Sequence, residues 1–265
     1  MNRIDKLFQE KQEKILSIYF TAGYPNIDDT LPIMEAIEAA GGDIIEIGIP
    51  FSDPIADGPT IQDSNKIALE NGMTLRLLFK QLADMRAKIT TPVVLMGYLN
   101  PIIQYGMEAF CQKCQEVGVD GLILPDLPMQ QYLDEFKGVF DRYGLKNTFL
   151  ISPQTSANRI REIDNNSDGF IYMVSSHSIT GAKSGISDEQ LEYFQRVKDM
   201  DLKNPRLIGF GISDRASFEK VSGYAHGAII GSAFIKVISK AKNLTEEIKT
   251  YIQEVKKDYN YDHSS

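Results

Sequence analysis

Residues 43–60 read DIIEIGIPFSDPIADGPT, an apolar run followed by a loop rich in Pro, Gly and Asp. Similar apolar runs recur along the chain and alternate with longer amphipathic stretches, which is the pattern of repeated βα units around a parallel sheet. We predict eight strands, over Leu16–Thr21, Asp43–Gly48, Pro92–Gly97, Gly121–Leu124, Asn147–Ile151, Gly169–Val174, Arg206–Gly209 and Gly227–Gly231. Eight strand–helix units predict closure into a single (β/α)8 TIM barrel.

Helices are predicted between the strands and at the N-terminus. The clearest patterns cover Thr30–Ala40, Met129–Tyr143 and Ala216–Val221, and Arg3–Lys14 forms an extra amphipathic helix that we expect to cover the barrel floor. Because no linker, low-complexity segment or close repeat divides the chain, we expect one domain over residues 1–265, with the N-terminal helix in residues 1–14 and a frayed tail at 257–265. A doubly wound sheet usually carries G-x-G-x-x-G after its first strand, where this chain has TAGYP.

The composition excludes several classes of function. Hydrophobic residues make up 43% of the chain and charged residues 24%, which is ordinary for a globular protein with a core. A net charge of -8 argues against a nucleic-acid partner, because binding to a phosphate backbone requires clustered Lys and Arg. The chain has no signal core and no uninterrupted apolar run of about 18 residues, so we expect a cytoplasmic protein that does not engage membranes.

The two cysteines, Cys111 and Cys114, form a lone C-x-x-C within a predicted helical stretch. A zinc site would need a second pair or histidines at metal-ligand spacing, and neither accompanies them. Residues three apart share a helix face, so we interpret the pair as packing residues and not as a redox or metal centre.

Glu46 interrupts an otherwise apolar strand, and period-two alternation places it on one face with Ile44 and Gly48. Burial raises the proton affinity of a carboxylate into a range useful for acid–base chemistry, although a polar network could also satisfy a buried Glu. The following loop adds Asp53 and Asp57 at the carboxyl end of the strand, where TIM-barrel active sites form. Both aspartates, Asp53 above all, could instead be turn formers beside Pro or Gly.

A second group of candidate residues is glycine-rich and follows the last three strands. It comprises Thr180-Gly181, Gly209-Phe210-Gly211-Ile212-Ser213 and Gly231-Ser232. Glycine lets backbone amides approach an anion, and we expect Ser232 to cap a short helix from Ala233 whose dipole favours phosphate. Glycine at a strand end more often answers a steric demand, but the shared location of the three segments predicts a phosphate site.

Four segments give the chain its resemblance to a known family. They are FTAGYP at 20–25, EIGIPFSDPIADGPTIQ at 46–62, GFGIS at 209–213 and GSA at 231–233. Together with the order and spacing of all eight units, they resemble the α subunits of tryptophan synthase. The resemblance implies a lyase of tryptophan biosynthesis that cleaves indole-3-glycerol phosphate to indole and glyceraldehyde 3-phosphate and passes indole to a β subunit.

The resemblance also implies the roles of individual residues. Asp57 would accept a hydrogen bond from the indole N–H, while Glu46 would deliver a proton to indole C3 and remove one from the glycerol hydroxyl. Phosphate-binding positions match Gly181, Gly211, Gly231 and Ser232, and pocket or loop positions match Tyr19, Tyr98, Tyr172 and Thr180. No metal or organic cofactor is implied, and the partner would be a pyridoxal-phosphate β subunit in an α2β2 assembly.

The loop after the sixth strand departs from the family pattern. Members commonly carry Ser-Arg-x-Gly-x-Thr-Gly, whereas residues 175–181 read SSHSITG and lack the Arg and the first Gly. We interpret His177 as a loop residue and not as an extra acid–base group. Two other functions stay open from the residues alone: another phosphate-binding barrel, such as an isomerase of a phosphorylated sugar or indole precursor, and a non-catalytic subunit that only activates a partner.

Overall fold

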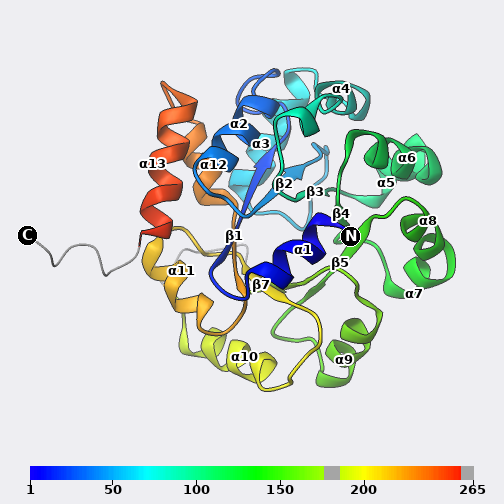
Figure 1. Ribbon diagram of the computed structural model, residues 1–265, viewed down its shortest axis with the longest axis vertical. Coiled ribbons are helices and arrows are strands. Elements are labelled where there is room, and N and C mark those ends of the chain that lie inside the picture. Colours follow the sequence, from blue (N-terminus) through cyan, green and yellow to red (C-terminus); the bar gives the residue numbers. More distant parts are fainter. Residues whose placement is uncertain (176–185, 258–265) are drawn as a thin grey trace, which may run out of the picture.

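The computed structural model describes residues 1–175 and 186–257, and a closed barrel of eight parallel strands forms its centre (Figure 1). The strands are β1 (Ile15–Thr21), β2 (Ile44–Gly48), β3 (Val93–Met96), β4 (Gly121–Ile123), β5 (Lys146–Ile151), β6 (Ile171–Val174), β7 (Arg206–Gly209) and β8 (Gly227–Ile230). Neighbours in the chain pair with each other, and β1 also pairs with β8 to close the ring. The predicted (β/α)8 TIM barrel is confirmed.

Helices form the outer layer around the strands (Figure 1). Those within the βα units are α2 (Thr30–Ala39), α3 (Pro59–Glu70), α4 (Leu75–Gln81), α5 (Leu99–Tyr105), α6 (Met107–Val117), α7 (Met129–Gln131), α8 (Lys137–Arg142), α9 (Ala157–Asn166), α10 (Asp188–Lys198), α11 (Arg215–Ser222), α12 (Ser232–Ile238) and α13 (Leu244–Lys256), with a short 3-10 turn η1 (Met85–Ala87) and a π-helical turn η2 (Tyr132–Phe136). Within the described ranges, no helix combines the length and the apolar character that crossing a membrane requires.

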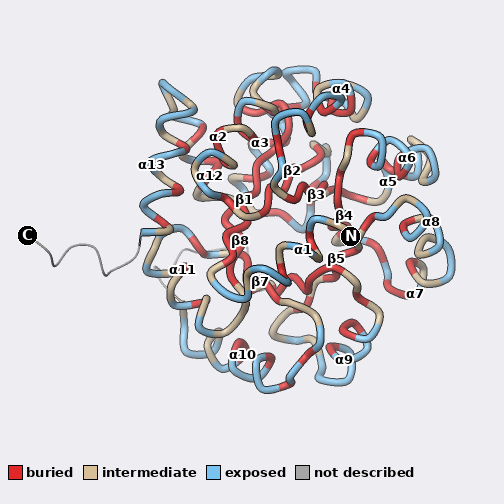
Figure 2. Tube along the Cα trace, in the orientation of Figure 1, coloured by how far each residue is buried: buried red, intermediate tan, exposed pale blue. Residues whose placement is uncertain are grey.

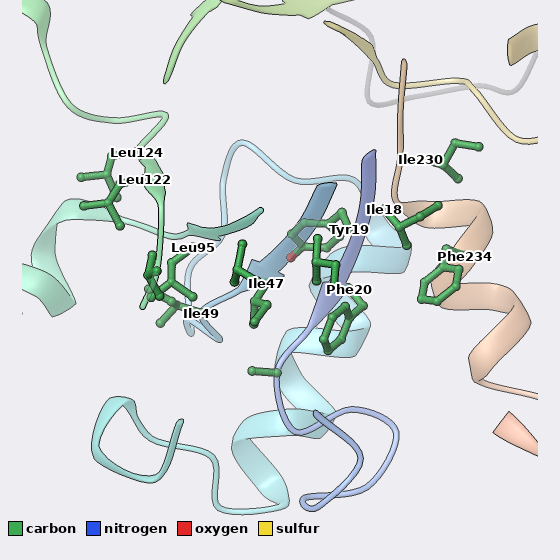
Figure 3. Packing of buried hydrophobic residues seen from close by; sticks show 14 of the residues in the cluster. Ile18, Tyr19, Phe20, Ile47, Ile49, Leu95, Leu122, Leu124, Ile230 and Phe234 are labelled. Atoms are coloured by element: carbon green, nitrogen blue, oxygen red, sulfur yellow. The ribbon is translucent and has the colours of Figure 1, made fainter. Parts of the chain in front are cut away.

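Side-chain alternation along the strands separates two apolar layers, and the strands are the most buried part of the molecule (Figure 2). The outer layer lies between strands and helices and contains Ile45 and Ile47 of β2. Figure 3 shows part of it, where Ile18 of β1 lies near Ile230 and Phe234. The inner layer fills the barrel and consists of Ile4, Phe8, Ile15, Ile44, Val94, Ile123, Phe170, Tyr172, Leu207 and Ile229.

The helix α1 (Arg3–Glu10) packs on the amino-terminal end of the barrel. Its residues Ile4 and Phe8 are buried in the inner layer, as expected for a helix that covers the barrel floor. The helix ends four residues earlier than predicted. Its end is set by the backbone, because Lys11 is extended and Lys14 adopts a left-handed φ of 52°, which turns the chain into β1.

Asp43, directly before β2, connects both ends of the chain to the barrel. Its carboxylate pairs with Lys11 Nζ at 2.7 Å, just after α1, and with Lys256 Nζ at 3.1 Å, at the end of α13. The same carboxylate accepts a hydrogen bond from the backbone N–H of Leu16 in β1 at 2.8 Å. The start of the strand that carries Glu46 is therefore tied to three other elements.

The single helix predicted over Met129–Tyr143 is confirmed to within one residue as a continuous helical run over 129–142, but it contains a π turn that the sequence did not predict. The π turn η2 separates α7 from α8. In a regular α-helix, residues eight apart are rotated by about 80° relative to each other, and the additional residue of a π turn removes most of this rotation. Tyr132 and Phe140 consequently share one buried face, with their ring centroids 5.4 Å apart.

Cys111 and Cys114 are free thiols on the buried side of α6. Both are fully buried in the outer apolar layer, which confirms that they are packing residues. Burial raises the pKa of the Cys111 thiol to about 12, so it stays protonated at neutral pH. In the part of the chain that the structure describes, no group of three or more His, Cys, Asp or Glu side chains is placed to hold a metal ion.

Candidate active site

Glu46 lies in the middle of β2, on the inner face of the barrel, and is fully buried. Ser17 of β1 donates a hydrogen bond from its Oγ to Glu46 Oε1 at 2.6 Å, whereas Oε2 has no hydrogen-bond partner among the described residues. Burial raises the pKa of Glu46 from its usual 4.5 to about 7, against the opposing effect of the hydrogen bond from Ser17. Glu46 can therefore both hold and release a proton near neutral pH.

Asp57 lies in the loop between β2 and α3 and is 4% exposed. Tyr98, which follows β3, donates a hydrogen bond from its hydroxyl to Asp57 Oδ2 at 3.1 Å. Within the described part of the chain, Oδ1 has no partner. Burial raises the pKa of Asp57 from 3.8 to about 6, and the hydrogen bond from Tyr98 opposes this effect. At neutral pH Asp57 is therefore mainly a charged carboxylate with one uncommitted oxygen.

The loop that carries Asp57 is attached to its surroundings at several points. The Tyr98 hydroxyl accepts a hydrogen bond from Ala56 N at 3.0 Å, and the Tyr98 ring stacks on Phe51 at a centroid distance of 5.0 Å. Phe51 N donates to Asn65 Oδ1 of α3 at 2.9 Å. Asp53 is exposed, and its carbonyl accepts from the N–H two residues later, in agreement with its alternative interpretation as a turn former.

Two buried tyrosines lie over glycines of the neighbouring strands. A Cβ atom added to Gly48 would lie 2.2 Å from the hydroxyl oxygen of Tyr19, and one added to Gly209 would lie 2.3 Å from that of Tyr172. Any side chain at these glycines would displace the rings, because real Cβ contacts do not come this close. Gly48 and Gly209 are thus required for the placement of Tyr19 and Tyr172 inside the barrel.

The same tyrosines experience the charges of both carboxylates. Burial raises the pKa of Tyr19 well above 10, and the negative charge of Asp57 raises it further. The pKa of Tyr172 is raised by burial and then by the charges of Glu46 and Asp57. Tyr19 and Tyr172 therefore remain neutral hydroxyl groups, and the structure brings the two carboxylates and these rings together at the carboxyl end of the barrel.

The segment after β7 has an unusual backbone. Phe210 adopts a φ of 69° and Gly211 a φ of 79°, and the left-handed region is uncommon for an aromatic residue. The hydroxyl of Ser175, at the end of β6, donates a hydrogen bond to the Phe210 carbonyl, and the Phe210 ring meets Tyr172 edge-on at 6.2 Å. Strained conformations of this kind concentrate at binding and catalytic sites.

The segment after β8 lies beside Tyr19 and opens helix α12. A Cβ atom at Gly231 would be in ordinary contact with the Tyr19 ring, at 3.4 Å. Gly231 occupies the cap position and its carbonyl accepts the first helical hydrogen bond, from Ile235 N at 2.9 Å. Ser232 is the first residue of the helix, so its predicted role as the cap was wrong. The earlier amides of α12 have no intrahelical acceptor and are available to an anion.

Five of the predicted site residues lie around one region of the barrel interior: Tyr19, Glu46, Asp57, Tyr98 and Tyr172. Gly211, Gly231 and Ser232 lie at the adjoining ends of β7 and β8. Thr180, Gly181 and His177 fall outside the described residues, as does nearly all of the tail predicted to be frayed. The sequence reasoning missed Ser17 and Phe210, although alternation along β1 places Ser17 on the same face as Tyr19.

A comparison with family models matches residues 6–262 to the model described as "Tryptophan synthase alpha chain". The chain belongs to the tryptophan synthase alpha chain family. This membership confirms the resemblance drawn from the four sequence segments. It also accounts for the order of the eight βα units, because the match spans the whole barrel.

Individual relatives agree with this family. The chain is 55% identical to a tryptophan synthase alpha chain of Flavobacterium johnsoniae, over 97% of this chain and 100% of the relative. It is 50% identical to that of Parabacteroides distasonis, with the same coverage of both chains. Among solved structures, the tryptophan synthase subunit alpha of Legionella pneumophila superposes with a TM-score of 0.86 at 36% identity, covering 96% of this chain and 97% of that one.

Replacement of Glu46 by Gln is expected to stabilise the protein more at pH 8 than at pH 5. Because the pKa of Glu46 is raised to about 7, the folded state binds its proton more tightly than the unfolded chain does, and this group costs stability as the pH rises from 4.5 through 7. Glutamine removes the dependence, so the gain in unfolding free energy should grow by about 2 kcal/mol between these pH values.

Urea denaturation at both pH values measures this difference. Asp63→Asn is the control substitution, because Asp63 is an exposed carboxylate on α3 outside the site. A Glu46→Gln effect of equal size at pH 5 and pH 8 would mean that Glu46 is not held at a raised pKa.

Proposed function

We propose that this chain catalyses the α reaction of tryptophan biosynthesis, the retro-aldol cleavage of indole-3-glycerol phosphate to indole and glyceraldehyde 3-phosphate, with Glu46 and Asp57 as the catalytic pair. Family membership makes the chain a carbon–carbon lyase of this pathway. The residue assignment rests on one observation: the two carboxylates have the same hydrogen-bonding arrangement. Each has one oxygen fixed by a hydroxyl and one buried oxygen that has no partner among residues 1–175 and 186–257.

Asp57 is suited to stabilise positive charge. Cleavage requires protonation of the indole ring at C3, and the resulting indolenine cation carries its positive charge at the ring nitrogen, which keeps its N–H. A carboxylate that accepts the N–H hydrogen bond stabilises this charge, and it does so most strongly where water is excluded. With a pKa of about 6, Asp57 is mainly charged at neutral pH, and Oδ1, which accepts no hydrogen bond from the described part of the chain, is the oxygen available to the N–H.

Glu46 is suited to move protons. In the proposed sequence the protonated acid gives its proton to indole C3, and the resulting carboxylate removes a proton from the glycerol hydroxyl. The electrons of that O–H bond form the aldehyde carbonyl, the C–C bond breaks, and its electrons restore the aromatic indole. The proton count balances, because Glu46 ends the cycle protonated. A pKa of about 7 makes both transfers accessible.

The phosphate group is assigned to the segments after β7 and β8. Gly211 and the first amides of α12 present backbone N–H groups there, and no cationic side chain is needed for such a site. This assignment places the phosphate at the corner where TIM barrels commonly bind it. Tyr19 and Tyr172 line the interior between this corner and the carboxylates, where they can contact the indole glycerol portion.

The family also implies a β subunit as partner, which we propose receives indole within an α2β2 assembly in the cytoplasm. Two exposed apolar side chains support a docking surface near the site. Ile55, in the loop that carries Asp57, is 79% exposed, and Ile103 of α5, the helix directly after Tyr98, is 49% exposed. A partner on this surface would contact the elements that hold Asp57, and it can raise activity by favouring the productive arrangement of the loop.

Glu46→Gln and Asp57→Asn should each lower indole release by about a hundredfold or more, because one variant cannot exchange protons and the other lacks the stabilising charge. Both keep the size of the side chain and should fold. Steady-state indole release is the measurement, and Asp63→Asn should retain the wild-type rate. Near-normal release by either active-site variant would remove that residue from the assignment, and absence of release by wild type would favour the non-catalytic subunit.

Gly231→Val should weaken binding of a phosphorylated substrate analogue by about tenfold or more, because the larger side chain crowds the amides that would hold the phosphate. Gly231→Ala should have a smaller effect, since a Cβ at this position makes only ordinary contacts. Titration with the phosphorylated analogue and its dephosphorylated form separates the two contributions. An unchanged preference for the phosphorylated form would place the phosphate site elsewhere.

A saturating cognate β subunit should raise indole release, and Ile55→Ser should reduce this activation while leaving the rate of the isolated chain unchanged. The physical reason is the loss of apolar contact at the docking surface. Ile67→Ser on α3 is the matched control, because Ile67 is an isoleucine with 37% exposure outside the loop. Equal rates with and without the β subunit would contradict activation itself.

A further inference from the structure

Ser17 is a polar residue in an otherwise apolar part of the barrel. It is fully buried on the inner face of β1, where its strand partners are Ile44 of β2 and Ile229 of β8. Both of these isoleucines belong to the inner apolar layer. A hydroxyl in such surroundings is costly unless it has a partner, and the partner of Ser17 is Glu46.

The hydrogen bond from Ser17 makes the two oxygens of Glu46 inequivalent. At 2.6 Å it has the length of an O–H donor bound to a charged oxygen. Oε1 is held toward β1 and the barrel floor by this bond, and Oε2 is the oxygen that no described residue contacts with a hydrogen bond. When Glu46 is protonated and Ser17 donates to Oε1, the proton resides on Oε2.

We propose that Ser17 is a positioning residue for the α reaction: its hydroxyl fixes Oε1 so that Oε2 is the oxygen that exchanges protons with the substrate. This inference rests on the proposed role of Glu46. Proton transfer requires the acid within hydrogen-bond reach of the reacting atom, and an unanchored carboxyl would share its proton between two oxygens and several orientations.

The alternative is that Ser17 only satisfies a buried carboxylate and has no bearing on proton transfer. Loss of the hydrogen bond shifts the pKa of Glu46 under either interpretation, so the two differ in kcat at the optimum pH, which falls only if Ser17 positions the acid. Among the described residues, the titratable groups that face Glu46 are Tyr19 of β1, Tyr172 of β6 and Asp57 of the β2–α3 loop. Val94, its partner on β3, does not titrate. Because both tyrosines stay neutral and Asp57 is unchanged by a substitution at Ser17, a shift in the limb assigned to Glu46 reports the loss of the hydrogen bond.

The test compares Ser17→Thr with Ser17→Val, which have nearly the same shape and differ in the hydroxyl. Indole release is measured against pH with saturating β subunit. In wild type, kcat/KM should fall on the acid side as Asp57 becomes protonated and on the alkaline side as Glu46 loses its proton. Ser17→Val should lower kcat about tenfold or more and move the alkaline limb upward by about one pH unit, because the bond that stabilised charged Glu46 is gone.

Ser17→Thr should keep the limb in place and retain most of kcat, and the KM of the valine variant should change little. If Ser17 only satisfies the buried carboxylate, the limb of the valine variant shifts but its kcat at the optimum pH stays near the wild-type value. That result, or a rate loss of equal size in both variants, would overturn the proposal. If the added methyl groups prevent folding, Ser17→Ala removes the hydroxyl without adding atoms and carries the same expectations. Glu46→Gln distinguishes failure of the Glu46 assignment from failure of the Ser17 assignment. If Glu46→Gln is active, the proposed role of Glu46 is wrong. If it is inactive while Ser17→Val and Ser17→Ala behave as wild type, only the proposed role of Ser17 is wrong.

Discussion

The burial of the Glu46 carboxyl group inside the barrel is the constraint on which the rest of the site depends. Taking a carboxylate out of water costs several kcal/mol unless hydrogen bonds or opposite charges compensate it. Here a single serine hydroxyl compensates in part, so the group keeps its proton to about neutral pH. The stability of a closed barrel with a large apolar core offsets the free-energy cost of burying this carboxylate. The raised proton affinity of Glu46 that results is the property that the proposed proton transfers require.

Burial also raises the pKa of Asp57, but this carboxylate lies on a loop and not on a strand. Glu46 belongs to a strand paired on both sides, whereas Asp57 belongs to a loop whose position is set by Tyr98, by the Phe51 ring and by a side chain of α3. One member of the catalytic pair is thus fixed by the sheet and the other by side-chain contacts at its edge. Regulation by a partner is more easily exerted on the second, because loop contacts cost less to rearrange than a strand ladder.

The architecture was predictable because two signals agree along the chain: the alternation of apolar residues within elements, and the Pro, Gly and Asp residues that follow them. Strands such as residues 43–48 alternate faces and are followed by Pro, Gly or Asp, so the placement of Glu46 on one face with Ile44 and Gly48 followed from the sequence. The π turn within the helix around Tyr132 was not predictable, since it depends on which ring the finished core must accommodate. The start of α12 at Ser232 also escaped, because both residues of Gly231-Ser232 are acceptable caps. Ser17 was missed because a lone serine in an apolar strand has no motif, and only its neighbour across the sheet gives it a role.

The contacts of Asp43 affect how the protein unfolds from its ends. An open solenoid can fray from an end, because its terminal units have a neighbour on one side only. In this ring the first strand pairs with the last, and the helices at both chain ends meet a single aspartate at the base of the strand that carries Glu46. Loosening of either terminus therefore removes one of the contacts that hold the base of β2. Local opening at either end of the chain is in this way transmitted to the start of the strand that carries Glu46.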